Sequence, residues 1–284
     1  MSQYFDTVTK IFAVWISVVE ALYLICFTGH RYDWKAFAIS LGDMLLRLAL
    51  VFWFPSSVVG FLAKFIVAHR LSNIIVDSWW MILVLFVAQE FFYYVYHRGC
   101  HRIRWFWASH QVHHTPTELN LSAGLRNGAF GHLIGIGVFY FPLVWLGFSS
   151  SALDAALTLN IKYQHFLHCT WIPKLGRLEG IFNTPSAHRV HHYAPGQVDE
   201  GNFGGVLVIF DRLFGTYVPE PDGIHPRFGL GTSSPGNNPF RVEFGYWAVM
   251  GKDLLAARSP GQVFRALFGR PGERPDVETP TGLS

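Results

Sequence analysis

Residues 79–101 read WWMILVLFVAQEFFYYVYHRGCH. Residues 79–96 are almost entirely apolar, and at about 1.5 Å per residue they make a helix about 27 Å long, close to the thickness of a hydrocarbon core. The two tryptophans at the start suit a membrane interface. The run ends directly at His97, and His101 follows four residues later, so a helix carries both imidazoles on one face. We therefore predict a membrane helix that presents two histidines at one end.

The whole chain has the composition of a membrane protein. Its 284 residues are 51% hydrophobic and 14% charged, with a mean hydropathy of +0.26, whereas soluble domains carry about a quarter charged residues. Four further apolar runs cover residues 11–28, 37–54, 130–148 and 151–168. The predicted fold class is all-α, an integral multi-pass membrane bundle of about four to five helices with a histidine-rich helical cap.

The first two apolar runs contain charged residues. Residues 11–28 are interrupted only by Glu20, and no small-residue cleavage site follows them, so an uncleaved anchor is expected. In residues 37–54, Asp43 and Arg47 are four positions apart, where a helix allows opposite charges to meet. Both runs therefore remain able to span a bilayer.

The order of the runs predicts the topology. The run at 79–96 ends at His97, the next run leaves from the same side, and residues 151–168 return to it with His168. All histidine clusters then face one compartment, and the positive-inside rule makes that side cytoplasmic. Lys64 and Arg70 fall on the opposite side and do not fit this rule. The basic residues on the histidine side are Arg98, Arg102, Arg104, Arg126, Lys174, Arg177, Arg189 and Arg212.

Charge and cysteine content exclude other classes of site. The net charge is +3 and no lysine- or arginine-rich block is present, so nucleic acid is not an expected partner. Cys26, Cys100 and Cys169 are far apart and form no CxxC pair. Reduced thiols are therefore expected, not disulfides or a zinc ribbon.

The chain is expected to divide near residue 220. Residues 1–220 would form the membrane domain, with the histidine clusters between residues 97 and 192. Residues 221–284 are rich in Pro, Gly and Ser and predict an irregular C-terminal extension with a disordered tail. Within it, Val263, Phe264, Leu267 and Phe268 predict either a short interfacial helix or a terminal helix packed on the protein.

Two later histidine clusters repeat one spacing. Residues 110–114 and 188–192 both read HxxHH, which places rings at i, i+3 and i+4 on one helix face. With 14 histidines in 284 residues, roughly 0.03 chance copies of this pattern are expected. We therefore interpret both clusters, together with the HxxxH of the first, as metal-ligating. The predicted ligands of these three clusters are His97, His101, His110, His113, His114, His188, His191 and His192.

A ninth ligand is expected from another helix. His168 ends the run at 151–168 on the side of the clusters, and His165 lies one turn earlier, where a supporting role explains it equally well. Eight or nine imidazoles exceed the roughly four to six positions of one ion, so two ions are implied. Zinc has no redox chemistry, and the chain lacks the HExxH pattern of zinc proteases. Iron is the preferred interpretation.

HxxxH, HxxHH and HxxHH, in this order between apolar runs, resemble the fatty acid hydroxylase and sterol desaturase superfamily. The similarity extends beyond the histidines, from about Gln89 to Glu220. It includes the segments Tyr93-Tyr94-Val-Tyr-His97-Arg98, Asn120-Leu-Ser, Thr184-Pro-Ser-Ala-His188, Gly201-Asn202-Phe-Gly-Gly205 and Asp211-Arg-Leu-Phe-Gly-Thr216. Within the superfamily the pattern is most similar to the C-5 sterol desaturase and alkylglycerol monooxygenase branch, because Gln164 stands where fatty acid 2-hydroxylases tend to have histidine.

The resemblance implies a membrane enzyme with two Fe2+ ions that uses O2 to hydroxylate or desaturate a lipid. Its electrons would come from NAD(P)H through cytochrome b5, ferredoxin or a reductase. The lipid could be a sterol, an alkylglycerol or a fatty-acyl lipid. Six further residues are expected to support the ligands or tie loops over the site, with ordinary capping and turn roles as the alternative. These are Glu90, Asn120, Gln164, His165, Asn202 and Asp211.

Two other classes of function fit parts of the sequence. A membrane metal or haem carrier would use histidines without redox catalysis, but it should place ionisable residues along a path at mid-membrane. A zinc-dependent membrane hydrolase would need a carboxylate base near the metal. The oligomeric state stays open, because aromatic helix faces serve lipid contact and dimer contact alike.

Overall fold

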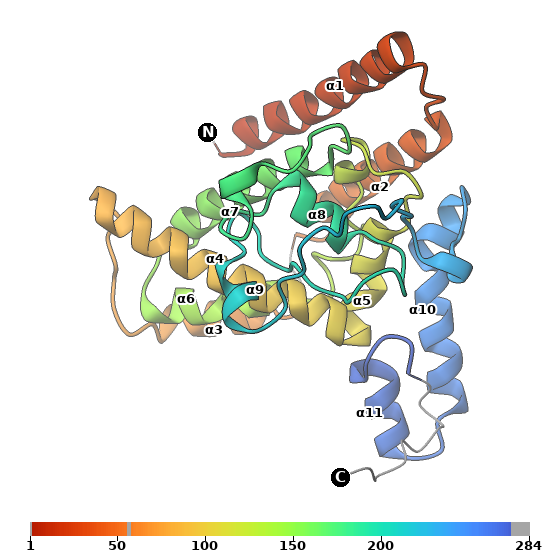
Figure 1. Cartoon of the computed structure of the whole chain (residues 1–284). Coiled ribbons are helices and arrows are strands. Elements are labelled where there is room, and N and C mark those ends of the chain that lie inside the picture. The colour runs from red at the N-terminus through yellow and green to blue at the C-terminus, as the bar shows by residue number, and fades with distance from the viewer. Residues whose placement is uncertain (1, 56–57, 274–284) are drawn as a thin grey trace.

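The computed structural model describes residues 2–55 and 58–273. Secondary structure in these residues is helical, with isolated β-bridges but no strand. Two long helices come first, α1 (Ser2–Thr28) and α2 (Trp34–Trp53), and Figure 1 shows them along one edge of the molecule. A short helix, α3 (Gly60–Ala68), precedes α4 (Trp79–Arg102), which crosses the middle of the molecule. The all-α prediction is confirmed.

Short helices follow α4 and carry most of the histidines. They are α5 (Arg104–His110), the 3-10 turns η1 (Gln111–His114), η2 (Ala123–Leu125) and η3 (Ile136–Tyr140), α6 (Phe141–Leu146), α7 (Ser150–His165), η4 (Phe166–His168), η5 (Gly176–Leu178), α8 (Pro185–His191) and α9 (Ile209–Leu213). The last elements in the described part of the chain are η6 (Gly231–Ser233), α10 (Pro239–Ala256) and α11 (Pro260–Phe268).

Among the described residues, three helices are long and apolar enough to cross a membrane. They are Thr9–Thr28 within α1, α2 and α4. Large apolar side chains on them face outward; Phe52 is 76% exposed and Trp79 is 78% exposed. Such surfaces are unfavourable in water and suit contact with lipid. The chain is therefore a membrane protein.

The predicted span at residues 130–148 is not one continuous helix. Turns occupy residues 129–135, followed by η3 and the six-residue α6. Gly135 adopts a left-handed conformation (φ 85°), and Pro142 cannot continue a helix that precedes it. The sequence pattern gave length and hydropathy, but these two residues interrupt the helix.

α6 and α7 form a hairpin against the first half of α4. Gly147 joins them at φ 126°, and a Cβ there would lie 2.5 Å from the carbonyl oxygen of Ser72, so only glycine fits. Leu85, Leu143, Phe148 and Leu153 form the core of this contact. The hairpin returns the chain to the end of α4 that carries the histidines.

The isolated charges in α1 and α2 bind the segments next to the histidines. Glu20 accepts hydrogen bonds from the backbone N–H of Leu121 (2.6 Å) and from Trp171 Nε1 (2.9 Å). Asp43 accepts from Asn127 N at 2.9 Å, and Arg47 donates to the carbonyl of Leu125 at 3.3 Å. Asp43 and Arg47 were expected to meet each other; both instead attach α2 to residues 125–127.

The C-terminal segment is more regular than its composition predicts. α10 is an 18-residue helix whose first turn is capped by Asn238, with Pro239 at its start. It packs against α2 and α5, and α11 packs on α5 and α10 with Ala266 buried. Phe264 and Phe268 of α11 remain exposed. The disordered tail was predicted for the end of residues 221–284, and residues 274–284 of that segment lie outside the described residues.

Candidate metal centre

The nine predicted histidines gather in two adjacent groups. We call the first site A and the second site B. In each group the potential ligand nitrogens all lie within 4.8 Å of one another. Site A consists of His97, His101, His110, His114 and His191, and site B of His113, His168, His188 and His192.

Each HxxHH cluster contributes to both sites. In the second cluster, positions i and i+4 belong to site A and the middle histidine, His113, belongs to site B. In the third cluster the assignment is reversed, and His191 alone belongs to site A. The rings of His114 and His192 stack between the groups with centroids 4.5 Å apart. The two identical spacings therefore join the sites to each other.

Five local elements supply these histidines. The last turns of α4 carry the first cluster, and the second lies where α5 tightens into η1, so it is not one regular helix as the spacing predicts. η4 carries His168, and α8 with its C-cap carries the third cluster. α8 begins at Thr184, whose hydroxyl accepts from Ala187 N (3.2 Å) and donates to Glu179 (2.7 Å). The cap fixes the start of a helix only seven residues long.

Several of the rings are oriented through their Nδ1 atoms. His97 Nδ1 donates to the carbonyl of Phe203 (2.9 Å) and His191 Nδ1 to that of Gly201 (2.9 Å). In site B, His113 Nδ1 donates to the carbonyl of Arg126 at 2.7 Å. Because Nδ1 carries the proton, Nε2 has a free lone pair directed into the group, as in protein metal sites.

The distances between Nε2 atoms fit bound metal ions. They are 3.0 Å for His97 and His110 and 3.1 Å for His110 and His101 in site A. Metal–nitrogen bonds of about 2.1 Å place two ligands about 3.0 Å apart at a right angle and about 3.4 Å apart at the tetrahedral angle. In the described residues, His114 Nε2 and His191 Nε2 are buried without a hydrogen-bond partner. Neutral imidazoles whose lone pairs converge in this way suit a bound cation.

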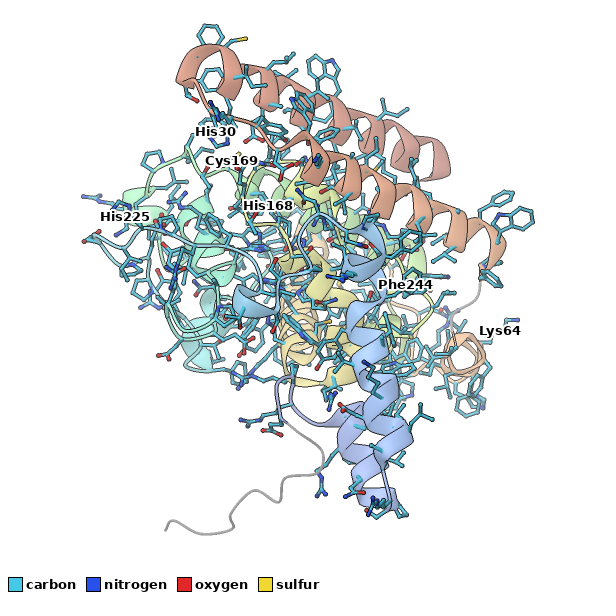
Figure 2. The ribbon with its side chains drawn as sticks, turned by 90° about the vertical axis from the view of Figure 1, so that its right-hand side faces the viewer. His30, Lys64, His168, Cys169, His225 and Phe244 are labelled. Atoms are coloured by element: carbon cyan, nitrogen blue, oxygen red, sulfur yellow. The ribbon has the colours of Figure 1, made fainter. Side chains whose placement is uncertain are left out.

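The same test holds in site B. His168 Nε2 lies 3.3 Å from His113 Nε2 and 3.2 Å from His188 Nε2. His192 Nε2 lies 3.2 Å from His188 Nε2. All four side chains are at least nine-tenths buried. Figure 2 shows His168 inside the molecule, whereas His30 and His225, which belong to neither site, lie near its edge.

Burial keeps these imidazoles neutral. It lowers the pKa of His113 and of His191 to about 4. Burial, followed by the neighbouring histidines, lowers the pKa of His110 and His114 well below the usual range. Burial lowers the pKa of His192 in the same way. The neutral imidazole is the form that binds a metal ion.

The loop at residues 200–207 positions three histidines of site A. Its carbonyls accept from His97 and His191, and Glu200 Oε1 lies 2.7 Å from His101 Nδ1. Glu90, predicted to orient an imidazole, instead accepts from Val206 N (2.7 Å) and Leu207 N (2.8 Å). Glu90 therefore holds the loop whose carbonyls orient His97 and His191.

Asp211 and Asn202 hold the same loop. Asp211 accepts from Phe203 N and Gly204 N, each at 2.8 Å. Asn202 has a left-handed backbone (φ 57°), and its side-chain amide donates to the carbonyls of Ala187 (2.9 Å) and Val218 (2.8 Å). It thereby joins the loop to α8.

The other three predicted supporting residues act differently. Gln164 orients His168 through its backbone carbonyl (3.0 Å), while its side chain accepts from Tyr93 OH (2.9 Å). His165 belongs to neither site, and backbone groups of Gly124 and Ala13 lie next to its ring. Asn120 accepts from Ser122 N (3.0 Å) and from its hydroxyl (2.6 Å), which is turn chemistry.

Sequence reasoning missed Glu200 and Arg126 as supporting residues. Glu200 is part of an ordinary polar stretch, and only the fold brings it to His101. Arg126 is 1% exposed, and its guanidinium donates to Thr115 Oγ1 (2.8 Å) and to the carbonyl of Ala36 (2.7 Å). The side chain fixes the position of a carbonyl on which His113 depends. An arginine in an otherwise apolar setting was the available signal.

This arrangement defines a class of protein. Residues 82–216 match the fatty acid hydroxylase family, and this part of the chain is a domain of that family. The matched segment includes all nine histidines of sites A and B. The resemblance inferred from the histidine spacing is confirmed.

Individual relatives are similar over most of this chain. It is 33% identical to the alkylglycerol monooxygenase of Xenopus tropicalis and 34% identical to that of Homo sapiens, in both cases over 207 residues, which are 73% of this chain and 46% of the relative. It is 28% identical over 183 residues to the ornithine lipid hydroxylase OlsE of Rhizobium tropici, covering 63% of this chain and 55% of the relative. The chain thus spans about half the length of these relatives. No solved structure matches it.

Proposed function

We propose that the protein is a multi-pass membrane oxygenase that hydroxylates a lipid with O2 at a pair of histidine-bound iron ions. The observation that carries the proposal is the division of nine histidines, eight of them buried, into two groups with inward-facing Nε2 atoms. Site A would hold one ion through five imidazoles and site B the other through four. The relatives' names, a monooxygenase of alkylglycerols and a hydroxylase of ornithine lipids, support oxygen insertion into a lipid.

Bound iron would supply the redox chemistry that an unactivated lipid C–H bond requires, since no side chain in the site is a base strong enough to remove its proton. The protein itself holds the imidazoles neutral and correctly oriented through backbone carbonyls. It also excludes water, because nearly all the rings are buried. The electrons would come from a cytochrome b5, a ferredoxin or a reductase. The histidine side is proposed to be cytoplasmic.

The two rival functions have less support. A zinc hydrolase needs a carboxylate base at the metal, and neither site includes one among its clustered ligands. A carrier needs an open route for its ion, whereas sites A and B are built from buried side chains locked by outer hydrogen bonds.

The test compares the wild-type chain with His191→Ala and with His225→Ala, which changes an exposed histidine outside both sites. Purified wild type and His225→Ala should each contain two iron ions per chain, and His191→Ala should contain fewer. Untargeted lipidomics of host membranes should reveal a lipid that gains one oxygen in the first two only. A lipid that loses two hydrogens would indicate desaturation. Purified wild type that binds no iron would contradict the proposal.

A further inference from the structure

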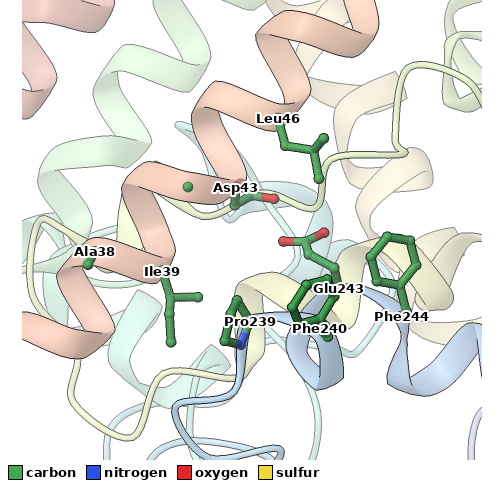
Figure 3. A pocket seen from close by; sticks show the side chains of 9 residues that line it. Ala38, Ile39, Asp43, Leu46, Pro239, Phe240, Glu243 and Phe244 are labelled. Atoms are coloured by element: carbon green, nitrogen blue, oxygen red, sulfur yellow. The ribbon is translucent and has the colours of Figure 1, made fainter.

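A cavity of about 340 Å³ lies between α2 and α10, outside the two metal sites. Its walls are apolar and include Ile39, Leu46, Phe240 and Phe244. Its polar lining comes from Asp43 and Glu243, whose carboxyl groups lie next to each other (Figure 3). An apolar pocket with a few polar groups at one place is the usual form of a small-ligand site.

Both carboxyl groups are buried and incompletely bonded. Asp43 is 2% exposed and Glu243 is 6% exposed. One oxygen of each accepts from the backbone, from Asn127 N at 2.9 Å and from Ala129 N at 3.4 Å. Asp43 Oδ1 and Glu243 Oε1 receive no hydrogen bond from an N–H group or a hydroxyl in the described residues; the two side chains bond to each other, which takes one proton between them. Each oxygen keeps a further lone pair, so the cavity suits a ligand that donates hydrogen bonds.

The charges around the cavity favour a neutral donor over a metal cation. Burial, and then Asp43, raises the pKa of Glu243 to about 8, so the pair keeps one shared proton at neutral pH. The guanidinium of Arg126 attracts the remaining negative charge and partly offsets the rise in the pKa of Glu243. Arg47 lies on the same helix as Asp43. Hydroxyl groups would satisfy the free oxygens without adding charge.

The surroundings indicate that the donor belongs to a lipid. Phe240 and Phe244, at the rim, are 74% and 43% exposed, and α2 is one of the helices able to cross a membrane. A hydrocarbon chain attached to the hydroxyl groups would remain in contact with these rings. Alkylglycerol and ornithine lipids, the lipids in the relatives' names, both have headgroups that donate hydrogen bonds.

The cavity and site B share a wall. The peptide between Arg126 and Asn127 donates its N–H to Asp43 and accepts from His113 Nδ1 through its carbonyl. Ile39, which lines the cavity, packs with Val112, the residue before His113. A ligand bound to Asp43 would therefore be linked to His113 of site B through a single peptide group.

We propose that this cavity binds the hydroxyl-bearing headgroup of the lipid substrate, with Asp43 and Glu243 as its hydrogen-bond acceptors. The assignment rests on the proposed lipid oxygenase function and adds to it the headgroup chemistry that decides which lipids are accepted. The two residues are binding residues outside the metal sites.

Binding can be measured without turnover. Full-length protein as purified, in lipid nanodiscs without O2 or an electron donor, would be titrated with a radiolabelled 1-O-alkylglycerol and with its di-O-methyl ether. The wild type should bind the free diol roughly tenfold or more tightly than the ether, because the ether cannot donate. Glu243→Leu, which removes the acceptor oxygens, should remove that preference. Equal binding of diol and ether by the wild type would overturn the proposal, and stronger binding of an ornithine lipid than of the diol would replace hydroxyl by amine as the recognised donor.

A second variant protects against misfolding of the first. An added Cβ at Gly42, which lines the cavity, meets no atom within 4 Å, so Gly42→Leu should fill the cavity without disturbing the fold. It should lose diol binding while retaining two iron ions per chain. Unchanged binding by Gly42→Leu would refute the site. If wild type and variants alike bind no iron but the wild type still prefers the diol, the oxygenase function fails and the headgroup site stands.

Discussion

Glu200 Oε1 lies 2.7 Å from His101 Nδ1, and this contact joins a partly exposed carboxylate to a buried histidine of site A, since the Glu200 side chain is 43% exposed and that of His101 is 3% exposed. The other oriented rings of site A donate to backbone carbonyls. A carboxylate partner makes an imidazole a better metal ligand than a carbonyl does.

Glu200→Gln should therefore weaken metal binding at site A by about 10-fold to 100-fold. The measurement is iron stoichiometry during titration with a chelator, where the variant should lose one of two ions early. Asp199→Asn, which changes the exposed neighbouring carboxylate, is the matched control. Identical chelator curves for wild type and Glu200→Gln would mean that this contact does not affect affinity.

Asn202 combines a left-handed backbone with two hydrogen bonds from its side chain. Asn202→Ala should lower the free energy of unfolding by about 2–4 kcal/mol, from lost hydrogen bonds and from backbone strain. Asn202→Gly removes the bonds but tolerates the backbone, so its loss should be smaller. Thermal unfolding checks both variants, and a larger loss for glycine than for alanine would contradict this explanation.

Gly124 leaves room for the side chains of His165 and His168. A Cβ at this position would lie 2.8 Å from His165 Nδ1 and 3.1 Å from His168 Nδ1. Gly124→Ala should displace His168 and reduce metal content at site B while site A keeps its ion. Gly245→Ala on α10, where an added Cβ meets nothing within 4 Å, should leave both ions bound. Full occupancy of both sites in Gly124→Ala would show that the ring can move without cost.

The pKa of Glu243 predicts a pH dependence of stability. Burial and the facing Asp43 raise this pKa from 4.5 to about 8, so the folded protein holds a proton that the unfolded chain releases. The stabilising contribution is complete below pH 4.5 and is lost as the pH rises to about 8. Subtracting the Glu243→Gln unfolding curve from that of the wild type at each pH isolates it. A difference that stays constant between pH 5 and pH 8 would rule out this proton.

The clustered histidines could be predicted from sequence because their spacing is local. HxxxH and HxxHH favour rings on one side of a helical turn, and three such clusters predicted two ions, although the second cluster spans the junction of α5 and η1. Apolar length likewise identified α1, α2 and α4. It could not reveal that Gly135 and Pro142 break residues 130–148, or that Asn238 and Pro239 start an 18-residue helix in a segment that looks irregular.

The sequence by itself thus determined the membrane class and the nine histidines, because hydropathy and ligand spacing are properties of neighbouring residues. Only the tertiary structure decided how His113 and His191 cross between the sites, because the clusters meet only when α4, α5, η4 and α8 pack together. It also decided that Glu90, Asn202 and Asp211 act through the loop at 200–207 and that Glu200 reaches His101. These contacts join residues up to 117 positions apart, such as Glu90 with Val206 and Leu207, and no local pattern encodes such a pairing.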